Sequence, residues 1–336
     1  MREDRIMLAH GAGGVMMSEL IAERIVSRLK NPQLDRLEDS AVLDVQGGRL
    51  AFTTDSFVVQ PLFFPGGDIG RLAVCGTVND LAMGGAVPRW LSLGLILEEG
   101  LKFADLDRIL ESIATTAGEA GVRVVTGDTK VVERGACDGI FINTAGLGVI
   151  PEGRNLDSYS IGIGDKVLLS GTIAEHGLAV MLAREKLEIS SPLVSDVACL
   201  HELAASLLDA APGTRAMRDP TRGGVAAALC DFAAASGVCI EIDETSVPLT
   251  DAARGACEIG GFDPLIVANE GKLVAVVPPD QADSALAALR SHPLGGNAAI
   301  IGEATASPEG KVVMRTSIGG RRFVEKPYGE QLPRIC

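Results

Sequence analysis

Residues 89–130 read RWLSLGLILEEGLKFADLDRILESIATTAGEAGVRVVTGDTK, and this stretch decides the fold class. The run from Arg89 to Leu97 predicts a strand, and Phe103 to Ala120 predicts a helix. A second strand, Val122 to Val125, reads as buried and ends in Gly127-Asp128-Thr129-Lys130. That turn places a carboxylate, a hydroxyl and an ammonium group together at a strand terminus. Strand, helix and strand in succession indicate a sheet covered by helices.

The same alternation of helices and strands continues on both sides of this stretch. In the first half we expect helices near 16–30 and within 68–86, and strands near 49–55 and 140–150. The elements expected in the second half are 166–170, 174–185, 197–211, 240, 251–259, 273–277, 281–290, 298–301 and 312–315. The predicted fold class is therefore α+β, with two domains of related architecture and no residue-level repeat between them.

The domain boundary is expected just after residue 150. Residues 151–165 are rich in Pro, Gly, Asn, Asp and Ser, as linkers are. A chain of 336 residues is also too long for one compact core. We expect an N-terminal domain at 1–150, a C-terminal domain at 151–320 and a mobile tail at 321–336.

The composition excludes several classes of partner. The net charge of −14 argues against nucleic acid or an anionic membrane, because both require a basic surface. A nucleotide carrying Mg²⁺ remains compatible with it. The chain shows no basic start followed by an apolar run, and no apolar run of about 18 residues. A cytoplasmic location is therefore expected.

Three acidic residues stand at positions suited to a metal-nucleotide complex. Asp39 follows Glu38, and Asp55 ends a β-prone run. Carboxylates at strand ends hold Mg²⁺ with few protein ligands and several waters, although a turn-capping Asp is the ordinary alternative. Asp80 follows Asn79 inside a helix of small residues, where a carboxylate needs a partner such as a metal.

Two glycine-rich stretches can offer backbone N–H groups to phosphate. His10-Gly-Ala-Gly-Gly14 precedes a helix, but a flexible turn explains it equally well, and it lacks the Lys-Ser/Thr ending of a P-loop. Arg218-Asp-Pro-Thr-Arg-Gly-Gly224 opens another helix, in which Pro220 fixes a turn and the glycines allow close backbone approach.

The chain ends in Pro333-Arg-Ile-Cys336. None of the seven cysteines forms a Cys-x-x-Cys pair or lies at metal-ligand spacing to a histidine, so a structural metal site is not expected. Six of them lie in apolar or helical surroundings, whereas Cys336 ends a segment that Pro327, Gly329 and Pro333 make extended. On position alone, Cys336 is either an accidental terminal residue or a mobile reactive thiol.

Together these stretches resemble the hydrogenase maturation family HypE, within the PurM-like superfamily of aminoimidazole ribonucleotide synthetase and selenophosphate synthetase. The matching stretches, in family order, are His10–Gly14, Phe52–Ser56, Pro61–Gly67, Thr77–Ala82, Thr126–Val131, Arg218–Gly224, Ala268–Lys272 and Pro333–Cys336. The terminal Pro-Arg-Ile-Cys is highly specific, whereas the Asp motifs are shared across the superfamily. Glu38-Asp39 stands where superfamily members often carry Asp-Asp, which keeps a carboxylate there.

The resemblance implies a two-domain PurM-like architecture and an ATP-dependent carbamoyl dehydratase. The N-terminal domain would bind ATP and Mg²⁺ and would dimerise, with ATP between the subunits of a homodimer. Cys336 would receive a carbamoyl group from a HypF-type carbamoyltransferase, and ATP would drive dehydration of the S-carboxamide to S-cyanate. The cyanide would then pass to iron on a HypC–HypD complex during [NiFe] hydrogenase maturation.

The resemblance also assigns roles to individual residues. The metal-nucleotide residues are expected to be Asp39, Asp55, Asp80 and Asp128, with Asn79 and Thr129 as lesser contacts. Lys130 would neutralise charge on the transferring phosphoryl group, and Arg222 would contact phosphate through its planar fork.

The remaining expected site residues lie near the carboxamide or near the nucleotide. Glu270 is the candidate base for the carboxamide nitrogen, oriented by Asn269, while a turn carboxylate paired with Lys272 is the alternative. His10 and Gly13 are placed at the nucleotide, with a capping role as the alternative for His10.

Two other functions compete with this interpretation. A selenophosphate-synthetase-like or ribonucleotide-synthetase-like enzyme would use the same ATP site on a diffusible substrate. The first usually carries a catalytic Cys or selenocysteine near its N-terminus, and here no Cys precedes Cys75. A non-catalytic carrier would hold a group on Cys336 without using ATP, and the acidic residues count against it.

Overall fold

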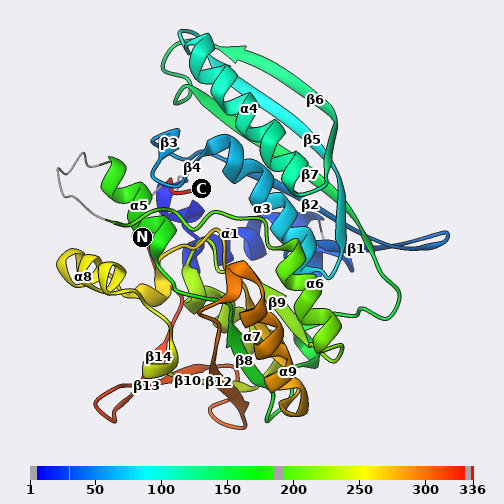
Figure 1. Cartoon of the computed structure of the whole chain (residues 1–336), viewed down its shortest axis with the longest axis vertical. Helices are drawn as coiled ribbons and strands as arrows, with labels where there is room; N and C mark the ends of the chain where they lie inside the picture. The colour runs from blue at the N-terminus through cyan, green and yellow to red at the C-terminus, as the bar shows by residue number, and fades with distance from the viewer. Residues whose placement is uncertain (1–5, 30, 185–191, 330–333) are drawn as a thin grey trace.

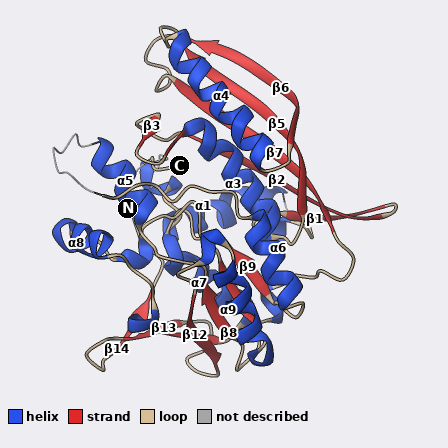
Figure 2. Cartoon of the chain, viewed as in Figure 1, coloured by secondary structure: helices blue, strands red, loops and turns tan. Residues whose placement is uncertain are grey.

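The computed structural model describes residues 6–29, 31–184, 192–329 and 334–336. Two large sheets, each with helices packed against it, account for most of the described chain (Figure 2). The predicted α+β class is therefore confirmed. Among the described helices, none is both long and apolar enough to cross a membrane.

The first sheet has the strand order β1-β2-β7-β5-β6. The bounds of these strands are β1 Ala41–Val45, β2 Gly48–Phe57, β7 Ile140–Ile150, β5 Val87–Glu98 and β6 Arg123–Val132. β5 and β6 run parallel and are joined through helix α4 (Phe103–Glu119), the kind of crossover that parallel strands require. α4 and α3 (Ile69–Met83) cover one face of the sheet (Figure 1).

Helix α3 lies at the centre of the molecule, between the first sheet and the second half of the chain. Asp68 caps its first turn, because its side chain accepts the backbone N–H groups of Gly70 and Arg71 at 2.7 and 3.1 Å. Small residues let the helix approach the sheet closely: a Cβ on Gly76 would lie 2.9 Å from the Phe57 ring. α3 is therefore buried on nearly all sides, and only Asp80 and Arg71 keep partial exposure.

The second sheet has the order β14-β13-β10-β12-β8-β11-β9. Its strands are β14 Arg321–Val324, β13 Val312–Arg315, β10 Cys239–Asp243, β12 Ala299–Thr305, β8 Lys166–Leu169, β11 Val274–Val277 and β9 Ala216–Arg218. The helices of this half are α5 Glu175–Arg184, α6 His201–Ala210, α7 Gly224–Ser236, α8 Asp251–Gly260 and α9 Ala282–Ser291. The remaining elements with Figure 1 labels are α1 Val15–Leu20 and the hairpin strands β3 Phe63–Phe64 and β4 Gly67–Asp68; α1 continues through a π-helical turn, Ile21–Val26, into α2 Ser27–Leu29.

The central strands of the second sheet are buried on both faces. Along β8, Val167 and Leu169 belong to the core cluster under α7, while Leu168 belongs to the cluster under α6 and α9. This alternation follows from the two-residue period of a strand, and it explains why β8 reads as a continuous apolar run. The two cores fix the positions of the loops that open toward the first sheet.

Three expectations about individual elements are wrong. β6 is an edge strand with exposed residues rather than a buried strand, and it runs through Gly127–Lys130 instead of ending there. The reason is that β6 pairs only with β5, so its outer side has no neighbour in the described chain. The segment expected as helix from residue 197 becomes helical only at His201.

The tail was expected to begin at residue 321, but the residues that follow 321 belong to a strand. Arg321–Val324 forms β14 and pairs with β13, from Arg315↔Arg321 to Val312↔Val324, so these residues belong to the second sheet. The end of the chain, residues 334–336, lies near β3, β4 and α5 (Figure 1).

Candidate active site

A cavity of about 780 Å³ opens where the two halves of the chain meet. This volume lies in the range of small-molecule and cofactor sites. Its lining comes from α1, β2, α3, the start of α7 and the chain end. Its polar lining residues include Asp39, Asp55, Asp80, Arg218, Asp219, Arg222, Glu270, Lys326 and Cys336. Residues from eight distant parts of the sequence are thus gathered around one space.

Five aspartates line this cavity: Asp39, Asp55, Asp80, Asp219 and Asp231, of which Asp231 pairs with Arg218 and Lys326. Burial raises the pKa of Asp39 to about 6, although the Arg218 guanidinium opposes the shift. Burial also raises the pKa of Asp80 well above its usual range, and the neighbouring carboxylates of Asp55, Asp219 and Asp39 raise it further. Like charges gathered in a partly dry site indicate that a cation belongs among them.

Unpartnered oxygens in the same cavity fit a cation. The Oδ2 atom of Asp39 and the Oε1 atom of Glu270 are buried and accept no hydrogen bond. In the described part of the chain, no three His, Cys, Asp or Glu side chains form a complete metal site. This donor set suits a cation such as Mg²⁺, which takes one or two carboxylates and completes its shell with water and phosphate oxygens.

Two arginines of the loop before α7 have different surroundings. Arg218 is held by carboxylates, with its Nε 2.8 Å from Asp39 Oδ1 and its Nη1 2.8 Å from Asp231 Oδ2. Arg222 is half-buried at the cavity wall and, within the described residues, forms no ion pair. The Cys336 thiol and Asp55 raise the pKa of Arg222, so its charge is secure. Arg222 is therefore the guanidinium available to an anionic ligand.

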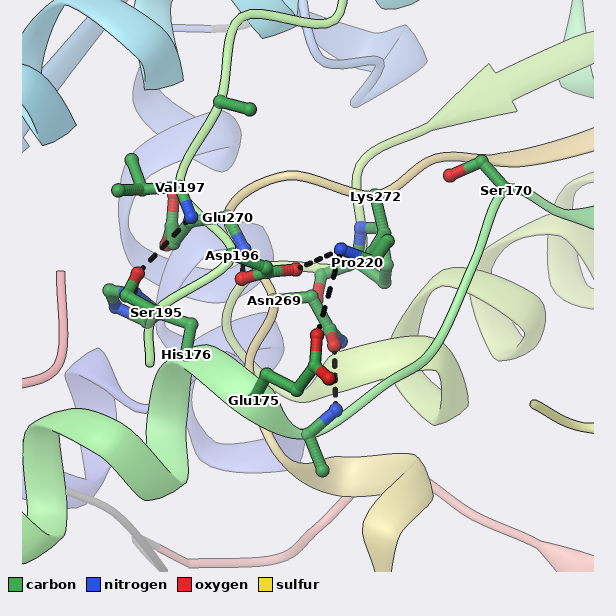
Figure 3. Close-up of polar contacts among 12 residues, drawn as sticks. Ser170, Glu175, His176, Ser195, Asp196, Val197, Pro220, Asn269, Glu270 and Lys272 are labelled. Atoms are coloured by element: carbon green, nitrogen blue, oxygen red, sulfur yellow. Dashed lines mark hydrogen bonds and ion pairs between the residues drawn. The ribbon is translucent and has the colours of Figure 1, made fainter. Parts of the chain in front are cut away.

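Glu270 has a fixed backbone and a free side chain (Figure 3). Its N–H donates to Asp196 Oδ1 at 3.0 Å, and its carbonyl oxygen accepts from the N–H of Ala198 at 3.3 Å and from Asn79 Nδ2 at 3.4 Å. Burial raises the pKa of Glu270 well above its usual range, with Asp219 and Asp196 adding to the shift and Arg222 opposing it. A carboxyl group whose pKa is raised in this way is a stronger base once it is deprotonated.

The end of the chain is docked into the cavity wall. The N–H groups of Val58 and Gln60 donate to the carbonyl oxygens of Cys336 and Arg334, each at 3.2 Å, and the Arg334 side chain pairs with Asp138. Ile335 is buried in the core cluster of the first sheet. Cys336 itself is half-buried, and its thiol faces Arg222 and Glu270.

The docked thiol is protonated at neutral pH. Burial raises the pKa of Cys336 to about 12, and Glu270 adds to the shift while Arg222 opposes it. Only a thiolate is a good nucleophile, so the thiol is unreactive in this position. The mobility expected of the tail stays a prediction, because the structure gives one position of residues 334–336.

The residues expected from the β6 motif do not reach this cavity. Asp128, Thr129 and Lys130 are exposed on the edge strand, and Lys130 Nζ lies 2.6 Å from Asp128 Oδ2. The hydrogen bond from Lys130 lowers the pKa of Asp128. Within one copy of the chain, Asp128 is therefore separate from Asp39, Asp55 and Asp80, which share the cavity lining.

Two expected contacts hold loops in the structure. Asn79 is buried, and its amide binds the carbonyl of Ala198 and the N–H of Leu200, which joins α3 to the loop before α6. Asn269 accepts the N–H of Ala174 and donates to the carbonyl of Pro220 (Figure 3). Neither amide is directed at a ligand here, and both position the loops that carry Glu270 and Arg222.

The N-terminal turn packs on the loop before α7. Gly13 lines the cavity with a φ of +76°, and a Cβ there would lie 2.5 Å from the backbone of Arg222. His10 accepts the N–H of Met7 at 3.0 Å and does not line the cavity, which favours the capping role.

Sequence reasoning missed several charged residues of the cavity, among them Asp219 and Lys326. Asp219 is buried among the other carboxylates, which together with burial raise its pKa well above the usual range. Its position between Arg218 and Pro220 is typical of a turn residue. The Arg218–Gly224 motif around it was the only feature of the sequence that could have indicated a role in the site. Lys326 pairs with Asp231 and donates to Ser18 Oγ, and nothing in its local sequence indicated a site.

Comparison with known proteins shows which family this chain resembles. The models for the N-terminal and C-terminal domains of AIR synthase related proteins match residues 37–150 and 162–315. "Carbamoyl dehydratase HypE" of Rhodobacter capsulatus is 51% identical over 339 residues, which is 100% of this chain and 99% of that protein.

Two solved structures are also similar. One is a HypE–HypF complex, with a TM-score of 0.87 and 48% identity, covering 92% of this chain and 99% of that chain. The other is the hydrogenase maturation protein HypE in complex with ATP, with a TM-score of 0.83 and 44% identity, covering 99% of this chain and 100% of that chain.

Proposed function

Because the chain belongs to the HypE family of carbamoyl dehydratases, which act in hydrogenase maturation, we propose that the cavity described above is its ATP site and that Cys336 carries its substrate. The observation that carries this proposal is the position of Cys336, which lines the same cavity as Arg222, Glu270 and the aspartates. A similar HypE has been solved with ATP, which supports ATP as the nucleotide.

The reaction converts an S-carboxamide to an S-cyanate with loss of one water. The carboxamide oxygen attacks the γ-phosphorus of ATP, ADP leaves, and the nitrogen releases the first of its two protons. The resulting iminophosphate then loses its N–H proton to a base while the C–O bond to phosphate breaks, which forms the C≡N bond. ATP is needed because hydroxide is a poor leaving group and phosphate is a good one.

The chain's own groups divide this work. Asp39, Asp55, Asp80 and Asp219 would hold Mg²⁺, which supplies positive charge to the transferring phosphoryl group. Arg222 binds phosphate oxygens, and Glu270 takes the nitrogen proton. The raised pKa of Glu270 makes it a stronger base once it is deprotonated.

Lys130, Asp128 and Thr129 enter through a second copy of the chain in this proposal. β6 offers an unpaired edge of ten residues on which Val124, Val125 and Val131 are exposed. Such an edge is an aggregation hazard unless something covers it. A homodimer formed over β6 covers the edge and brings the β6 motif of one copy toward the cavity of its partner.

The high pKa of the docked thiol separates carbamoylation from dehydration. A carbamoyl donor requires the thiolate, so the donor acts on Cys336 when the chain end is outside the cavity. A HypF-type carbamoyltransferase is the proposed donor, since a similar HypE has been solved in complex with HypF. A HypC–HypD iron complex is the proposed acceptor, and all these steps are placed in the cytoplasm.

Intact mass spectrometry tests the proposal. Incubation with the carbamoyltransferase, carbamoyl phosphate and Mg²⁺-ATP should add one carboxamide to Cys336 and then remove one water. The Cys336→Ser variant should gain neither change while keeping its fold. A carboxamide that persists with Mg²⁺-ATP, without release of ADP, would instead describe a non-catalytic carrier.

A further inference from the structure

His176 contacts the end of the chain from inside the protein. It lies in the first turn of α5 and is fully buried, with 0% of its surface exposed. Its Nε2 atom is 2.6 Å from the carbonyl oxygen of Ile335, one residue before the reacting cysteine. A short contact of this kind between two buried polar groups is a hydrogen bond in which one side must supply the proton.

The neighbours of the ring identify the donor. Ser195 Oγ accepts the N–H of Val197 at 3.1 Å and lies 2.7 Å from His176 Nδ1 (Figure 3). The serine hydroxyl has one proton, which it donates to Nδ1. The neutral ring therefore carries its own proton on Nε2 and donates it to Ile335. Burial lowers the pKa of His176, which keeps the ring neutral at physiological pH.

The ring is also held in orientation by packing. Phe64 meets it edge to face, with ring centroids 5.5 Å apart and an interplanar angle of 89°. The N–H of Ser195 donates to the carbonyl of Pro65 at 2.8 Å, so the loop that fixes Nδ1 is itself fixed to the β3–β4 hairpin. The Nε2–H direction is thus set before the chain end arrives.

The same loop supports the candidate base. Asp196, next to Ser195, accepts the backbone N–H of Glu270 at 3.0 Å with Oδ1 and pairs with Lys272 Nζ at 3.0 Å with Oδ2 (Figure 3). His176 and residues 195–196 therefore link the docked chain end to Glu270 through three side-chain contacts: His176 with Ile335, Ser195 with His176, and Asp196 with Glu270. A displacement of one end of this link displaces the other.

We propose that His176 is a positioning residue for the dehydration: its Nε2–H holds the Ile335 carbonyl and so places the modified sulfur of Cys336 between Arg222 and Glu270. This inference rests on the proposed role of Cys336 as the carrier of the carboxamide. The backbone bonds from Val58 and Gln60 fix the direction of the chain end, and His176 fixes how deeply it enters.

Two variants of His176 distinguish the effect of its Nε2–H donor from the effect of the size of its ring. In His176→Gln the amide nitrogen lies near the position of Nε2 and keeps a donor for Ile335. In His176→Asn the amide lies near Nδ1, so the contact with Ser195 is kept and the donor is lost. His201→Asn on α6 is the matched control, because His201 is a partly buried histidine outside the cavity lining.

The first readout is alkylation of Cys336 by a bulky maleimide in the full chain without nucleotide, measured by peptide mapping. His176→Asn should be alkylated about tenfold faster than the unmodified protein, since a lost buried hydrogen bond changes an equilibrium by roughly that factor. His176→Gln and His201→Asn should stay within about twofold of it. Equal rates in all four proteins, or equal acceleration in both His176 variants, would overturn the proposal.

The second readout is single-turnover dehydration of protein carbamoylated beforehand. His176→Asn should slow cyanate formation and His176→Gln should restore most of the rate, while the affinity for ATP stays unchanged. Should His176→Asn fail to fold, Ser195→Ala removes the group that fixes the tautomer, and it should also accelerate alkylation; an unchanged rate there would contradict the proposal. Cyanate formation by Cys336→Ser would refute the proposed function while leaving the alkylation result intact.

Discussion

Seven acidic side chains line one cavity, and repulsion among their charged forms sets the behaviour of the ligand-free protein. Burial and neighbouring carboxylates raise the pKa of Asp80, Asp219 and Glu270 well above their usual ranges. Proton binding to these carboxyl groups is therefore favoured when no cation is present. Each carboxylate that helps to hold a cation also destabilises the folded protein when no cation is bound.

The first prediction at this scale concerns Asp80→Asn. The variant should lose ATP turnover, since it removes one metal-binding charge, and it should not unfold, since Asn keeps the shape of a protonated Asp. With a chelator present, it should melt at the same temperature as the unmodified protein or higher at pH 7. Normal ATP hydrolysis by the folded variant would sink the assignment of Asp80.

The sign of the pH dependence follows from the raised pKa. At a pH below 3.8, the pKa of Asp80 in the unfolded chain, Asp80 is protonated in both the folded and the unfolded state. Its contribution to the stability of the folded protein is then fully present. Between that value and the raised folded value, only the unfolded chain releases the proton, so stability falls as pH rises. The advantage of Asp80→Asn should therefore shrink when the melts are repeated at lower pH.

A second substitution, Glu270→Gln, separates binding from chemistry. It should bind ATP and accept the carbamoyl group but stall at the carboxamide, because loss of a general base costs about 10²–10⁴-fold in rate. Mass spectrometry should then find the carboxamide on Cys336 and little cyanate. A normal rate of cyanate formation would show that Glu270 only supports the loop around Asp196.

Individual residues were predictable where a motif had one chemical meaning. Asp80 could be singled out from sequence because a carboxylate inside a helix of small residues needs a partner. Asp39 and Asp55 each had a turn-capping alternative and were grouped with Asp80 by the family resemblance. Asn79 could not be understood that way, since its partners, the backbones of Ala198 and Leu200, lie 119 and 121 residues away. Asp219 was missed because an Asp before Pro has an ordinary explanation as a turn residue.

At the scale of elements, β6 and the chain end behave differently from what their sequences suggest. β6 has the apolar residues of a buried strand, yet it is the edge of its sheet, because neighbour order depends on contacts far away in the sequence. The chain end has the prolines of a free segment, yet Ile335 finds a place in the first core. Local propensity could not reveal either outcome.

The prediction for the chain end concerns nucleotide-driven docking. If the carboxamide and ATP meet only in the docked state, each ligand favours that state by its differential affinity. Mg²⁺-ATP should therefore slow alkylation of Cys336 while leaving an exposed control thiol unaffected. Protection should be partial, since a shift from 1:99 to 99:1 needs about 5.5 kcal/mol, more than a short chain end gains. Equal rates with and without nucleotide, on protein shown to bind it, would refute this docking.

At the scale of the whole molecule, one copy of the chain gives an incomplete set of the expected residues. The cavity gathers the carboxylates, Arg222, Glu270 and Cys336, while Lys130 stays on the outer edge of the first sheet. The two-domain architecture could be predicted from the alternation of elements, because each half buries its own sheet. The way in which two copies of the chain associate depends on the complementarity of their surfaces. This complementarity cannot be predicted from short stretches of the sequence.

Mixing two inactive variants tests whether Lys130 acts across a homodimer. Asp80→Asn damages the cavity, and Lys130→Ala damages the β6 motif, so each pure variant should fail to hydrolyse ATP. In a mixed dimer, the cavity of the Lys130→Ala copy faces the intact β6 of the Asp80→Asn copy, which makes one complete site. Random exchange yields about half mixed dimers with one complete site of two, so activity should recover to about a quarter of normal.

The matched control is a mixture of Asp80→Asn with Glu270→Gln, in which both changes lie in the cavity. Every dimer of this mixture has two damaged cavities, so no activity should return. Copies carrying different affinity tags establish that exchange has occurred in both mixtures. Full activity of pure Lys130→Ala, or no recovery after proven exchange, would place Lys130 outside the reaction and leave β6 as an edge without a catalytic role.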